Sequence, residues 1–588
     1  MKGFYNKILR IDLDRKAFWE DTVPESVYHK YLGGKGLGTY LLLENTPAGV
    51  EPYSSDNALI FATGPATDTR IWGCSRLGAF TKSPLTGGYC ESYTGGKVAE
   101  PAGRTGYDAI ILKGISSEPV YLEITTGRVV FHDASHLWGK ETYETEDAIK
   151  EAVGQKDAGI IVIGPAGENL ISYAVIENNY WRSLGRGGAG AVMGSKKVKG
   201  IAFYGSAKRE MAHPAAVDKL RKEIREKGKD DPGVKRYFAE GTIQMVRVQN
   251  KVGAFPTKYW SRGSYDKWEN LTIEKLREQC NVRPHACNSC FIACGKMSEV
   301  LGGRHQGLKL EGPEYETIGM FGGVCMIDDL REIIHLNDVC DRLGMDTITA
   351  GNVAGFAIEA SHRKDLGFKI EYGDVDAIAE LLHKIAYNEG VGAILAKGVR
   401  AAAREWGLED IAVHVKGMEP AAYDPRTEQG MALAYATSDR GACHLRATVY
   451  KAELSGMIPL DQSEGKAEIL IDFEDRHTLF DALILCRFFR DLYPWEKIGE
   501  IIYGTTGLEL DKKQLQAMAL NISNATREFN LREGMSPADD SLPPRFFEKL
   551  EDSGNVLRKS DFDRMLADYY RIKGWDGLEK TVCNDCQS

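Results

Sequence analysis

The first 208 residues contain short apolar runs that turn residues separate at close intervals. Runs at 58–63, 109–114, 120–124 and 159–164 have the apolar, β-like composition of strands. The first 14 residues alternate between polar and apolar side chains, as a first strand does. The glycine-rich stretch at 34–38 leads into residues 39–44, where we expect a helix to start. These features predict a β-sheet-rich domain over residues 1–208.

From Met211 onward the apolar residues recur with the period of a helix. Residues 213–227 show this period together with capping residues, and helical stretches are also expected at 329–344 and 376–389. A further helical region is expected from about 418 to 550, followed by a polar tail. The chain is therefore predicted to be an α+β protein. In it, the domain 1–208 is followed by two mainly α-helical domains, 209–417 and 418–588.

The composition limits the class of protein. At 588 residues the chain is too long for one core, and its 43% apolar and 27% charged residues are ordinary for a globular protein. No apolar run is long enough to span a bilayer, and the start lacks the apolar core of a signal peptide. A net charge of −10 argues against nucleic acid as the main partner. Twelve cysteines without an export signal indicate metal binding in a reducing compartment, so a cytoplasmic location is expected.

Three cysteines, Cys287, Cys290 and Cys294, lie close together in the sequence. Their first and last members are seven residues apart, so loop geometry rather than a regular helix must bring them together. Zinc also binds C-x-x-C pairs, but a structural zinc site usually has a second pair about 12–20 residues on, which this chain lacks. Three clustered thiols plus a distant one favour an iron–sulfur cluster over zinc, and both over inert buried thiols.

A glycine-rich segment, Gly185-Arg-Gly-Gly-Ala-Gly190, satisfies the spacing of a dinucleotide-binding loop. Its context does not fit that motif, because residues 178–184 do not read as a buried strand and no suitable acidic residue follows about 20 positions later. Flanked by Arg182 and Arg186, the segment suits a backbone nest for phosphate oxygens. A tight packing loop is the alternative, and the segment alone favours it.

Two segments share one pattern, in which an Asp, an apolar turn and a second polar or thiol group follow one another. They are Asp341 to Asp346 and Asp481 to Cys486. Carboxylates fixed at helix ends would suit the NH-rich edge of a pterin-like heterocycle. A helix cap followed by a surface charge is the alternative for each segment alone. The pairing of the two segments, and Cys486 as a free distal thiol, support the functional interpretation.

Glu316 and His444 are candidates for an acid–base pair, although the sequence does not show whether they meet. A lone histidine is more often a satisfied hydrogen-bonding residue than a catalyst. Cys583 and Cys586 form a C-x-x-C pair next to the C-terminus, where a pair in an unstructured tail is more common than a metal site.

Many segments of the chain, in order, resemble the tungsten-dependent aldehyde:ferredoxin oxidoreductase family. Among them are Tyr31-Leu-Gly-Gly-Lys-Gly-Leu and Glu311-Gly-Pro-Glu-Tyr-Glu. The other matching stretches lie at 82–87, 107–110, 163–170, 186–196, 422–426, 435–444 and 569–575. The likeness runs nearly from end to end, which makes it far more specific than any single motif.

This resemblance implies a first domain that carries the cofactor and two helical domains that enclose it. The cofactor would be one tungsten bound by two pyranopterins (a tungstopterin), whose phosphates share a magnesium ion. Beside it, a 4Fe-4S cluster would be ligated by Cys287, Cys290, Cys294 and Cys486. The pterin contacts carried over by motif are Arg76, Gly95, Arg182, Gly185, Arg186, Asp341, Asp346, Arg446, Asp481 and Leu485. The sequence does not distinguish tungsten from molybdenum.

Three departures from the family pattern limit this inference. Tyr93 stands where relatives carry an Asn that binds magnesium or pterin, and Arg446 replaces a Lys. The segment from His335 to Asp338 differs from the Glu-bearing segment that binds a bridging iron at a dimer interface, and His383 is offset from the second ligand. We therefore do not expect that iron, nor the particular homodimer that it joins.

The activity implied by the resemblance is oxidation of an aldehyde to a carboxylic acid, with Glu316 and His444 as the catalytic residues. Electrons would leave through the cluster to ferredoxin or to a small iron–sulfur subunit, in a homo- or hetero-oligomer. One alternative keeps the cofactor and reduces aromatic thioesters of coenzyme A. Another, from a different class, is a noncatalytic subunit that only conducts electrons through its cluster.

Overall fold

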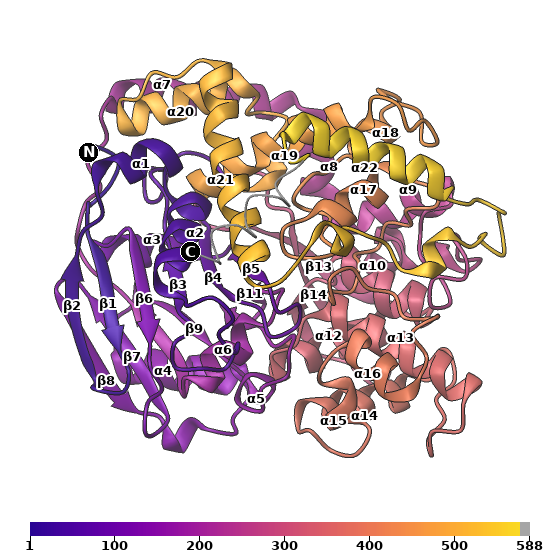
Figure 1. Ribbon diagram of the computed structural model, residues 1–588. Coiled ribbons are helices and arrows are strands. Elements are labelled where there is room, and N and C mark those ends of the chain that lie inside the picture. Colours follow the sequence, from indigo (N-terminus) through magenta and orange to yellow (C-terminus); the bar gives the residue numbers. More distant parts are fainter. Residues whose placement is uncertain (577–588) are drawn as a thin grey trace, which may run out of the picture.

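The computed structural model describes residues 1–576 of the chain, so the pair Cys583 and Cys586 lies outside the described residues. The N-terminal part contains two six-stranded sheets (Figure 1). The first has the order β2-β1-β6-β3-β4-β5, with β1 (Ile8–Asp12), β2 (Ala17–Asp21), β3 (Leu59–Ala62), β4 (Leu77–Lys82), β5 (Tyr89–Thr94) and β6 (Ala109–Lys113). The second has the order β11-β10-β9-β12-β7-β8, with β7 (Val120–Thr125), β8 (Arg128–Asp133), β9 (Gly159–Val162), β10 (Ile176–Asn178), β11 (Arg182–Leu184) and β12 (Val198–Phe203). The predicted β-sheet-rich N-terminal region is confirmed.

The two sheets pack face to face through the alternating side chains of their strands. Leu59 and Phe61 of β3 point into the core between the sheets, whereas Ile60 of the same strand points to the opposite face. Phe61 meets Phe203 of β12 across this core, with ring centroids 6.4 Å apart. Because both sheets contribute a buried apolar face, the domain is a sandwich with its own core.

Helices cover the outer faces of the sandwich. Helix α2 (Gly34–Asn45) lies on the first sheet, where a Cβ at Gly38 would come within 2.3 Å of the Phe80 ring. Helix α4 (Thr142–Val153) covers the second sheet through Ile149. The predicted helix is present, but it begins at Gly34 and so includes the glycine-rich stretch 34–38. The glycines of this stretch let the helix approach the sheet closely.

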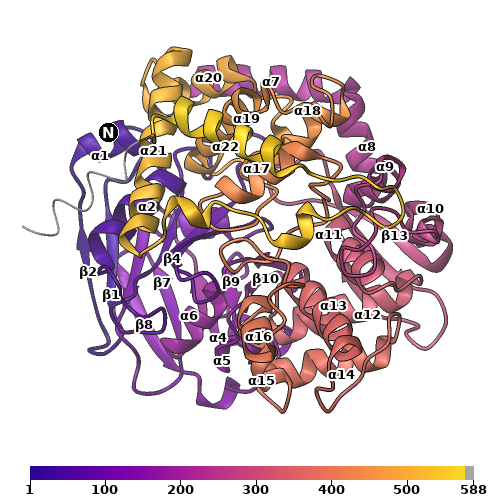
Figure 2. The same cartoon turned by 45° about the vertical axis from the view of Figure 1, so that its right-hand side comes forward.

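The rest of the chain is mostly helical, which confirms the predicted fold class. Its longer helices are α7 (Pro214–Asp230), α8 (Pro232–Glu240), α9 (Gln244–Val252), α10 (Ile273–Gln279), α12 (Leu330–Leu343), α13 (Thr347–Arg363), α14 (Val375–Ala386), α16 (Val399–Trp406), α17 (Gln429–Thr437), α19 (Lys466–Leu483), α20 (Trp495–Thr506), α21 (Lys512–Arg532) and α22 (Lys559–Lys573). In the view of Figure 2, α12 to α16 form the lower right of the molecule and α17 to α22 lie above them. No helix among residues 1–576 combines the length and apolar character needed to cross a membrane.

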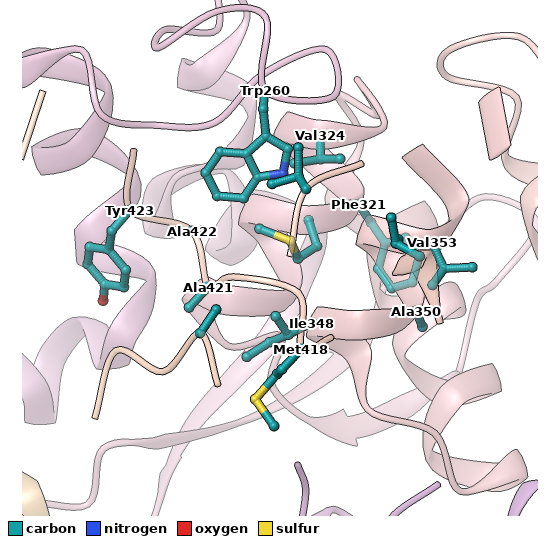
Figure 3. Packing of buried hydrophobic residues seen from close by; sticks show 14 of the residues in the cluster. Trp260, Phe321, Val324, Ile348, Ala350, Val353, Met418, Ala421, Ala422 and Tyr423 are labelled. Carbon is teal, nitrogen blue, oxygen red and sulfur yellow. The ribbon is translucent and has the colours of Figure 1, made fainter. Parts of the chain in front are cut away.

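One large hydrophobic core joins segments that lie far apart in the sequence. Trp260, Phe321, Ile348 and Met418 belong to it together with Tyr423 (Figure 3). The only polar atom of the Trp260 ring is satisfied, because its Nε1 donates to Asn352 Oδ1 at 2.8 Å. The residues before and after position 417 thus share a core, and the domain boundaries at 208 and 417 stay predictions.

Two elements were not expected from the sequence. A three-stranded sheet of β13 (Cys280–His285), β14 (Gly295–Val300) and β15 (Lys309–Glu311) interrupts the helical part. The predicted polar tail contains α22, which buries Phe562, Met565 and Tyr569. These three residues follow a helical period, but many polar residues between them conceal it in the sequence.

Replacing Phe61 by Ala is expected to destabilise the N-terminal sandwich by about 3–5 kcal/mol, because it removes a large fully buried side chain and leaves a cavity. A lower apparent midpoint of thermal unfolding would report this. The matched control is Phe238→Ala, since the Phe238 side chain on α8 is 50% exposed and its loss should change stability by about 0.5 kcal/mol or less. Equal midpoints for both variants would contradict the prediction.

Candidate active site and cysteine centre

A cavity of about 340 Å³ lies where the first sheet meets the helical part of the chain. Its walls come from β5, β11, the short helix α11 (Tyr315–Thr317), the end of α12 and two segments near residues 445 and 488. Most of the predicted site residues line it: Arg76, Gly95, Arg182, Gly185, Arg186, Cys294, Glu316, Asp341, Asp346, His444, Arg446 and Cys486. The structure thus brings together side chains that the sequence spreads from position 76 to position 486.

A second, smaller cavity of about 50 Å³ is lined by all four predicted cysteines. Cys287, Cys290 and Cys294 lie on the loop between β13 and β14, and Cys486 follows the end of α19. The two cavities share Arg76, Gly95, Arg182, Cys294, Cys486 and Phe488 in their walls. Groups bound in the two cavities would therefore be next to each other.

The four thiols surround a space rather than a point. Among residues 1–576, no three His, Cys, Asp or Glu side chains converge closely enough to bind a single metal ion. In a cubane cluster each thiolate binds a different iron, so the sulfurs need not converge. Burial raises the pKa of Cys290 to about 12 and that of Cys294 well above its usual value, so a bound cationic centre is needed to keep these thiols ionised. The donor set fits an iron–sulfur cluster better than zinc.

Backbone groups approach this small cavity closely. The Gly96 N–H donates to Cys287 Sγ at 3.2 Å, and a Cβ at Gly95 would lie 3.0 Å from the same sulfur. Gly73 binds the cysteine loop through its N–H, which donates to the Ser289 carbonyl at 2.9 Å. Glycine at position 95 therefore leaves room for a group bound by Cys287.

The large cavity presents many buried polar atoms that have no partner within the described residues. They belong to Glu177, Trp181, Glu316, Arg440, His444, Arg446, Thr448 and Arg490. Buried polar groups are normally hydrogen-bonded, so this concentration indicates a ligand with many donors and acceptors. Arginines dominate the positive side of the wall: Arg76, Arg182, Arg186, Arg440, Arg446, Arg487 and Arg490. These residues fit a heterocycle that carries phosphate groups.

The glycine-rich segment combines both interpretations made from the sequence. A short strand, β11, does precede it, but this strand pairs antiparallel with β10 and so forms no parallel βαβ unit. A Cβ at Gly188 or Gly190 would lie 2.2 Å from a backbone oxygen, so these glycines serve tight packing. Gly185 lines the cavity instead. In β11 only Leu184 is fully buried, so the expectation that no buried strand leads into the segment is not contradicted, and the antiparallel pairing excludes a dinucleotide-binding unit.

The two arginines that flank this segment each bind a carboxylate of the protein. Arg186 donates to Asp346 at 3.0 Å and to the backbone oxygens of Ala442 and Glu419 at 3.0 and 2.6 Å. Its guanidinium is thus committed to the protein and ties the sandwich to the helical part. Arg182 forms a bidentate pair with Glu311 and lies in the wall of both cavities.

The paired Asp segments are both helix C-termini. Helix α12 ends at Leu343 and α19 at Leu483, and the next residue in each case is left-handed, with φ 81° at Gly344 and 64° at Ile484. The first Asp of each segment, Asp341 or Asp481, thus lies in the last turn of its helix. The second polar group, Asp346 or Cys486, follows two residues after the left-handed residue. The sequence did not show this for the second segment, because an isoleucine rarely adopts such a conformation.

The carboxylates of these segments have different surroundings. Asp341 lines the cavity and accepts from Asn337 Nδ2 at 2.8 Å. Asp346 caps α13, accepting from the Ile348 N–H at 3.0 Å, but it is buried and lines the cavity, so it is not the surface charge of the alternative interpretation. Asp481 does not line the cavity. Its Oδ2 instead accepts from two arginines of the wall, Arg446 at 2.7 Å and Arg487 at 2.5 Å. Leu485 is fully buried and is likewise absent from the wall.

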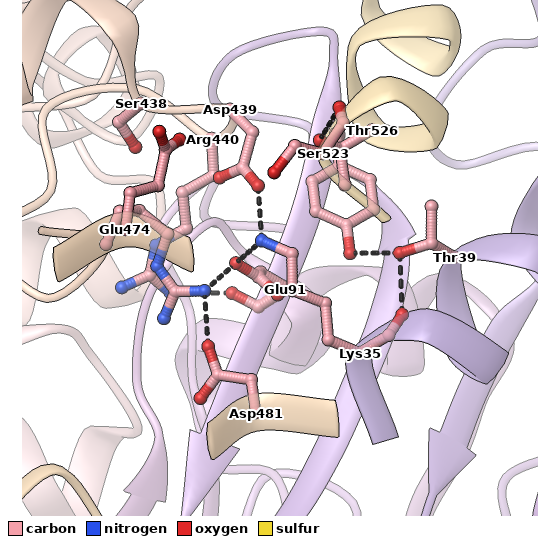
Figure 4. Close-up of polar contacts among 12 residues, drawn as sticks. Lys35, Thr39, Glu91, Ser438, Asp439, Arg440, Glu474, Asp481, Ser523 and Thr526 are labelled. Carbon is pink, nitrogen blue, oxygen red and sulfur yellow. Dashed lines mark hydrogen bonds and ion pairs between the residues drawn. The ribbon is translucent and has the colours of Figure 1, made fainter. Parts of the chain in front are cut away.

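A fully buried carboxylate, Glu91 of β5, connects these arginines to the first sheet. It accepts from Lys35 Nζ at 2.8 Å and from Arg446, and Lys35 also pairs with Asp439 at 2.5 Å (Figure 4). The hydroxyl of Tyr93, the residue that departs from the family pattern, donates to the same carboxylate at 2.5 Å. Neighbouring cations outweigh burial and hold the pKa of Glu91 at about 2.

Glu316 and His444 do meet. Glu316 Oε1 lies 3.4 Å from His444 Nε2, and both side chains line the cavity. Burial raises the pKa of Glu316 to about 7, although the Ala422 N–H donates to its Oε2 at 2.8 Å and opposes the shift. Burial, followed by four nearby arginines, lowers the pKa of His444 well below its usual value. The pair therefore combines a neutral imidazole with a carboxyl group that gains or loses its proton near neutral pH.

The three residues used to argue against an interfacial iron lie on α12 and α14. The His335 ring stacks on His305 at 4.3 Å, and Asp338 pairs with Arg342 at 2.7 Å. His383 lies in the last turn of α14. These contacts do not test the absence of that iron, which stays a prediction.

Several wall residues were missed in the sequence. Arg487 and Arg490 closely follow Cys486, so a positive charge next to the fourth cysteine was a usable signal. Glu91 and Lys35 do not line the cavity themselves but bind its arginines or their neighbours, and they carried no signal, because a single charge in a strand or helix usually faces solvent.

Comparisons with known proteins give a consistent result. A family model described as the N-terminal domain of aldehyde ferredoxin oxidoreductase matches residues 8–205, and one for domains 2 and 3 matches residues 219–581. The tungsten-containing aldehyde ferredoxin oxidoreductases of Pyrococcus abyssi and Pyrococcus furiosus are 36% and 35% identical to this chain. Each alignment covers 98% of this chain and 97% of the relative.

More distant similarity extends to other reactions. A WOR-like subunit of an aliphatic sulfonate oxidoreductase from Pyrococcus furiosus is 29% identical over 98% of this chain and 95% of its own length. Among solved structures, a chain of the active-site complex BamBC of benzoyl coenzyme A reductase, in complex with 1,5-dienoyl-CoA, superimposes with a TM-score of 0.83. It is 26% identical, and the match covers 98% of this chain and 95% of that chain.

Replacing Cys290 by Ser is expected to lower the iron content of the anaerobically purified protein, because one iron would lose its thiolate. Iron per chain, measured by mass spectrometry, checks this. Cys325→Ser is the matched control, since Cys325 is a buried thiol whose Sγ donates to the Gly351 carbonyl, a contact that a hydroxyl can keep. Undiminished iron in the Cys290 variant would argue against the cysteine centre.

Proposed function

Because this chain belongs to the aldehyde ferredoxin oxidoreductase family, we propose that it oxidises aldehydes to carboxylic acids. The aldehyde and one water give the carboxylate, three protons and two electrons. Ferredoxin, or a partner iron–sulfur subunit, accepts the electrons one at a time. The observation that carries the proposal is the contact between Glu316 and His444 in a cavity that shares its wall with the cysteine centre.

The two cavities fit the cofactors that this function needs. Arg76, Arg182 and Arg440, together with unpaired polar atoms such as Arg446 Nε, would hold a tungsten bis-pyranopterin and its magnesium ion in the large cavity. The small cavity would hold one 4Fe-4S cluster. Tungsten supplies a Lewis acid and a two-electron acceptor when bound. Carried over by motif, Arg76, Gly95, Arg182, Gly185, Arg186, Asp341, Asp346, Arg446, Asp481 and Leu485 are the proposed cofactor-binding residues. Of these, Asp481 and Leu485 would act from behind the wall, Asp481 by fixing Arg446.

Glu316 and His444 have complementary roles in this proposal. The Glu316 carboxylate accepts a proton from the attacking water, since its pKa near 7 suits both accepting and releasing that proton. The neutral His444 ring donates a hydrogen bond to the oxygen on which negative charge develops. Stacking on Tyr423, at a centroid distance of 5.7 Å, fixes the ring plane of His444.

The shared wall would couple the two redox centres. Cys294 and Cys486 border both cavities, so each thiol can ligate a cluster on one side and contact the pterin side on the other. No disulfide joins the ten cysteines within residues 1–576, which agrees with a reducing cytoplasmic environment. A partner iron–sulfur subunit would make the enzyme a hetero-oligomer, whereas free ferredoxin would serve a homo-oligomer or a single chain.

Glu316→Gln and His444→Asn variants are expected to lose aldehyde oxidation by on the order of 10² to 10⁴-fold, because each removes a group that moves or stabilises charge in the reaction. Turnover is to be measured with benzyl viologen as the acceptor, alongside tungsten, molybdenum, iron and zinc per chain. Near wild-type turnover in variants that keep tungsten and about four iron atoms would refute these roles.

The pH dependence of kcat should show an acidic limb with an apparent pKa of about 7, because Glu316 accepts a proton only when it is ionised. Turnover therefore rises as the pH increases through about 7 and falls as Glu316 is protonated below it. His444 adds no limb near neutral pH, since its pKa lies well below its usual value. A wild-type profile that stays flat between about pH 6 and 8, or a limb that persists in Glu316→Gln, would contradict the assignment of Glu316 as the base.

A second candidate function is reduction of an aromatic acyl-CoA thioester. The structural similarity to the BamBC complex, with a TM-score of 0.83, favours it specifically. The greater identity to aldehyde oxidoreductases, 36% against 26%, ranks it second. Assays with benzaldehyde and benzoyl-CoA on the same preparation separate the two reactions. The electron-conduit alternative is disfavoured by the unpaired polar atoms of the large cavity, and tungsten content tests it.

A further inference from the structure

Arg490 is a cavity residue that the proposed mechanism does not use. It lies four positions after Cys486, lines the large cavity and is 3% exposed. Its Nη1 donates to the Arg487 carbonyl at 2.9 Å, whereas Nε and Nη2 have no partner within the described residues. Its polar neighbours include the Tyr237 hydroxyl and the Asp491 carboxylate. Asp491 forms its ion pair with Lys451 rather than with Arg490. Arg490 therefore presents a buried positive charge without a carboxylate within ion-pair distance among residues 1–576.

Burying a positive charge in this way costs free energy unless an anion pairs with it. Three other buried arginines of the wall bind a carboxylate of the protein: Arg182 pairs with Glu311, Arg186 with Asp346, and Arg446 with Glu91 and Asp481. Arg440 has no carboxylate partner among residues 1–576, but it donates to the Glu91 carbonyl and to Cys443 Sγ. Arg490 differs from the first three in having no such pair within the described part of the chain. An anionic group of a ligand would supply it.

Aromatic rings form the walls next to Arg490. Tyr237 stacks on Phe488 with centroids 4.4 Å apart, and Tyr423 stacks on Tyr450 at 4.5 Å, and all four rings line the cavity. The hydroxyl of Thr448, which also lines the cavity, has no partner among residues 1–576. Flat apolar walls with a few polar atoms suit a planar or extended carbon frame.

This aromatic region connects Arg490 to the proposed catalytic pair. The Tyr450 hydroxyl is close enough to both Arg490 and Glu316 for each to shift its pKa. Tyr423, which stacks on Tyr450, also stacks on His444. Phe488, on which Tyr237 stacks, borders the cysteine cavity, whereas Arg490 itself does not. Arg490 is thus linked through Tyr450 and Tyr423 to the catalytic pair, where the aldehyde would react.

We propose that Arg490 binds an anionic group of the substrate, so that this enzyme prefers aldehydes that carry a carboxylate on an apolar frame. The inference rests on the proposed aldehyde oxidation and adds a substrate class to it. The guanidinium binds the distant carboxylate while the aldehyde carbon lies between Glu316 and His444. A phosphate of the cofactor is the other source of the same chemistry, and the experiment separates the two.

The test compares 4-carboxybenzaldehyde with benzaldehyde and succinate semialdehyde with butanal on the loaded enzyme. At least one carboxylated aldehyde is expected to have a KM about tenfold to a hundredfold lower than its uncharged partner, as a charge-assisted hydrogen bond would give. In Arg490→Gln this difference should disappear, with kcat and KM for the uncharged aldehyde unchanged. Arg490→Lys should restore part of the preference.

A double variant, Lys451→Gln with Asp491→Asn, is the matched control. It removes both members of an ion pair beside Arg490, neither of which lines the cavity, so no unpaired carboxylate is left to bind Arg490. The preference should remain within about twofold in this variant. A comparable loss in the double variant would attribute the effect to the surroundings of Arg490 and overturn its role.

Binding measured without turnover keeps this test independent of the proposed function. By calorimetry on the loaded wild-type protein, terephthalate is expected to bind about tenfold or more tightly than benzoate, and Arg490→Gln should remove the difference. Equal affinities, together with no preference in either aldehyde pair, would overturn the proposal. Loss of tungsten and pterin from Arg490→Gln would instead assign the residue to the cofactor phosphate and equally overturn it. Absence of aldehyde oxidation in a wild type that still prefers terephthalate would refute the function but keep the anion site.

Discussion

A single buried carboxylate, Glu91, is the interaction on which the rest of the site depends. It lies on β5 of the sandwich and meets Lys35 from α2 and Arg446 from the helical part, while Arg446 in turn binds Asp481 at the end of α19. Removing one partner of such a buried network typically costs about 3–5 kcal/mol, because an uncompensated charge remains. The cavity wall is thus held in place by ions that pair only when the distant segments of the chain have come together.

The protein divides its buried arginines between two tasks. Those that bind carboxylates, such as Arg186 with Asp346, join the sandwich to the helical part. Atoms left unpaired in the wall, including those of Arg440 and Arg446, remain available for a ligand. Burial raises the pKa of Glu316 and lowers that of His444, so both groups tend towards their neutral forms. The fixed charges of the arginines therefore dominate the electrostatic field around the pair.

Two helix ends place matching groups on the cavity and the cysteine centre. Helices α12 and α19 both stop at a left-handed residue, after which the chain turns and presents Asp346 or Cys486. At Gly344 this conformation is free of strain, but at Ile484 it costs energy that close packing against Gly34 must offset. The geometry at the second end therefore relies on tertiary contacts more than on local preference.

Strand alternation, helical period and cysteine spacing are local properties of a chain, so they sufficed to predict the β-sheet-rich start, the helical remainder and the loop that carries three cysteines. The family resemblance added most of the candidate site residues. Neither could show that Glu316 touches His444, that Asp481 binds arginines rather than lining the cavity, or that Arg490 lacks an anionic partner within the described residues. Those outcomes depend on which side chains from distant segments share a buried volume, because desolvation and pairing act only once that volume has formed.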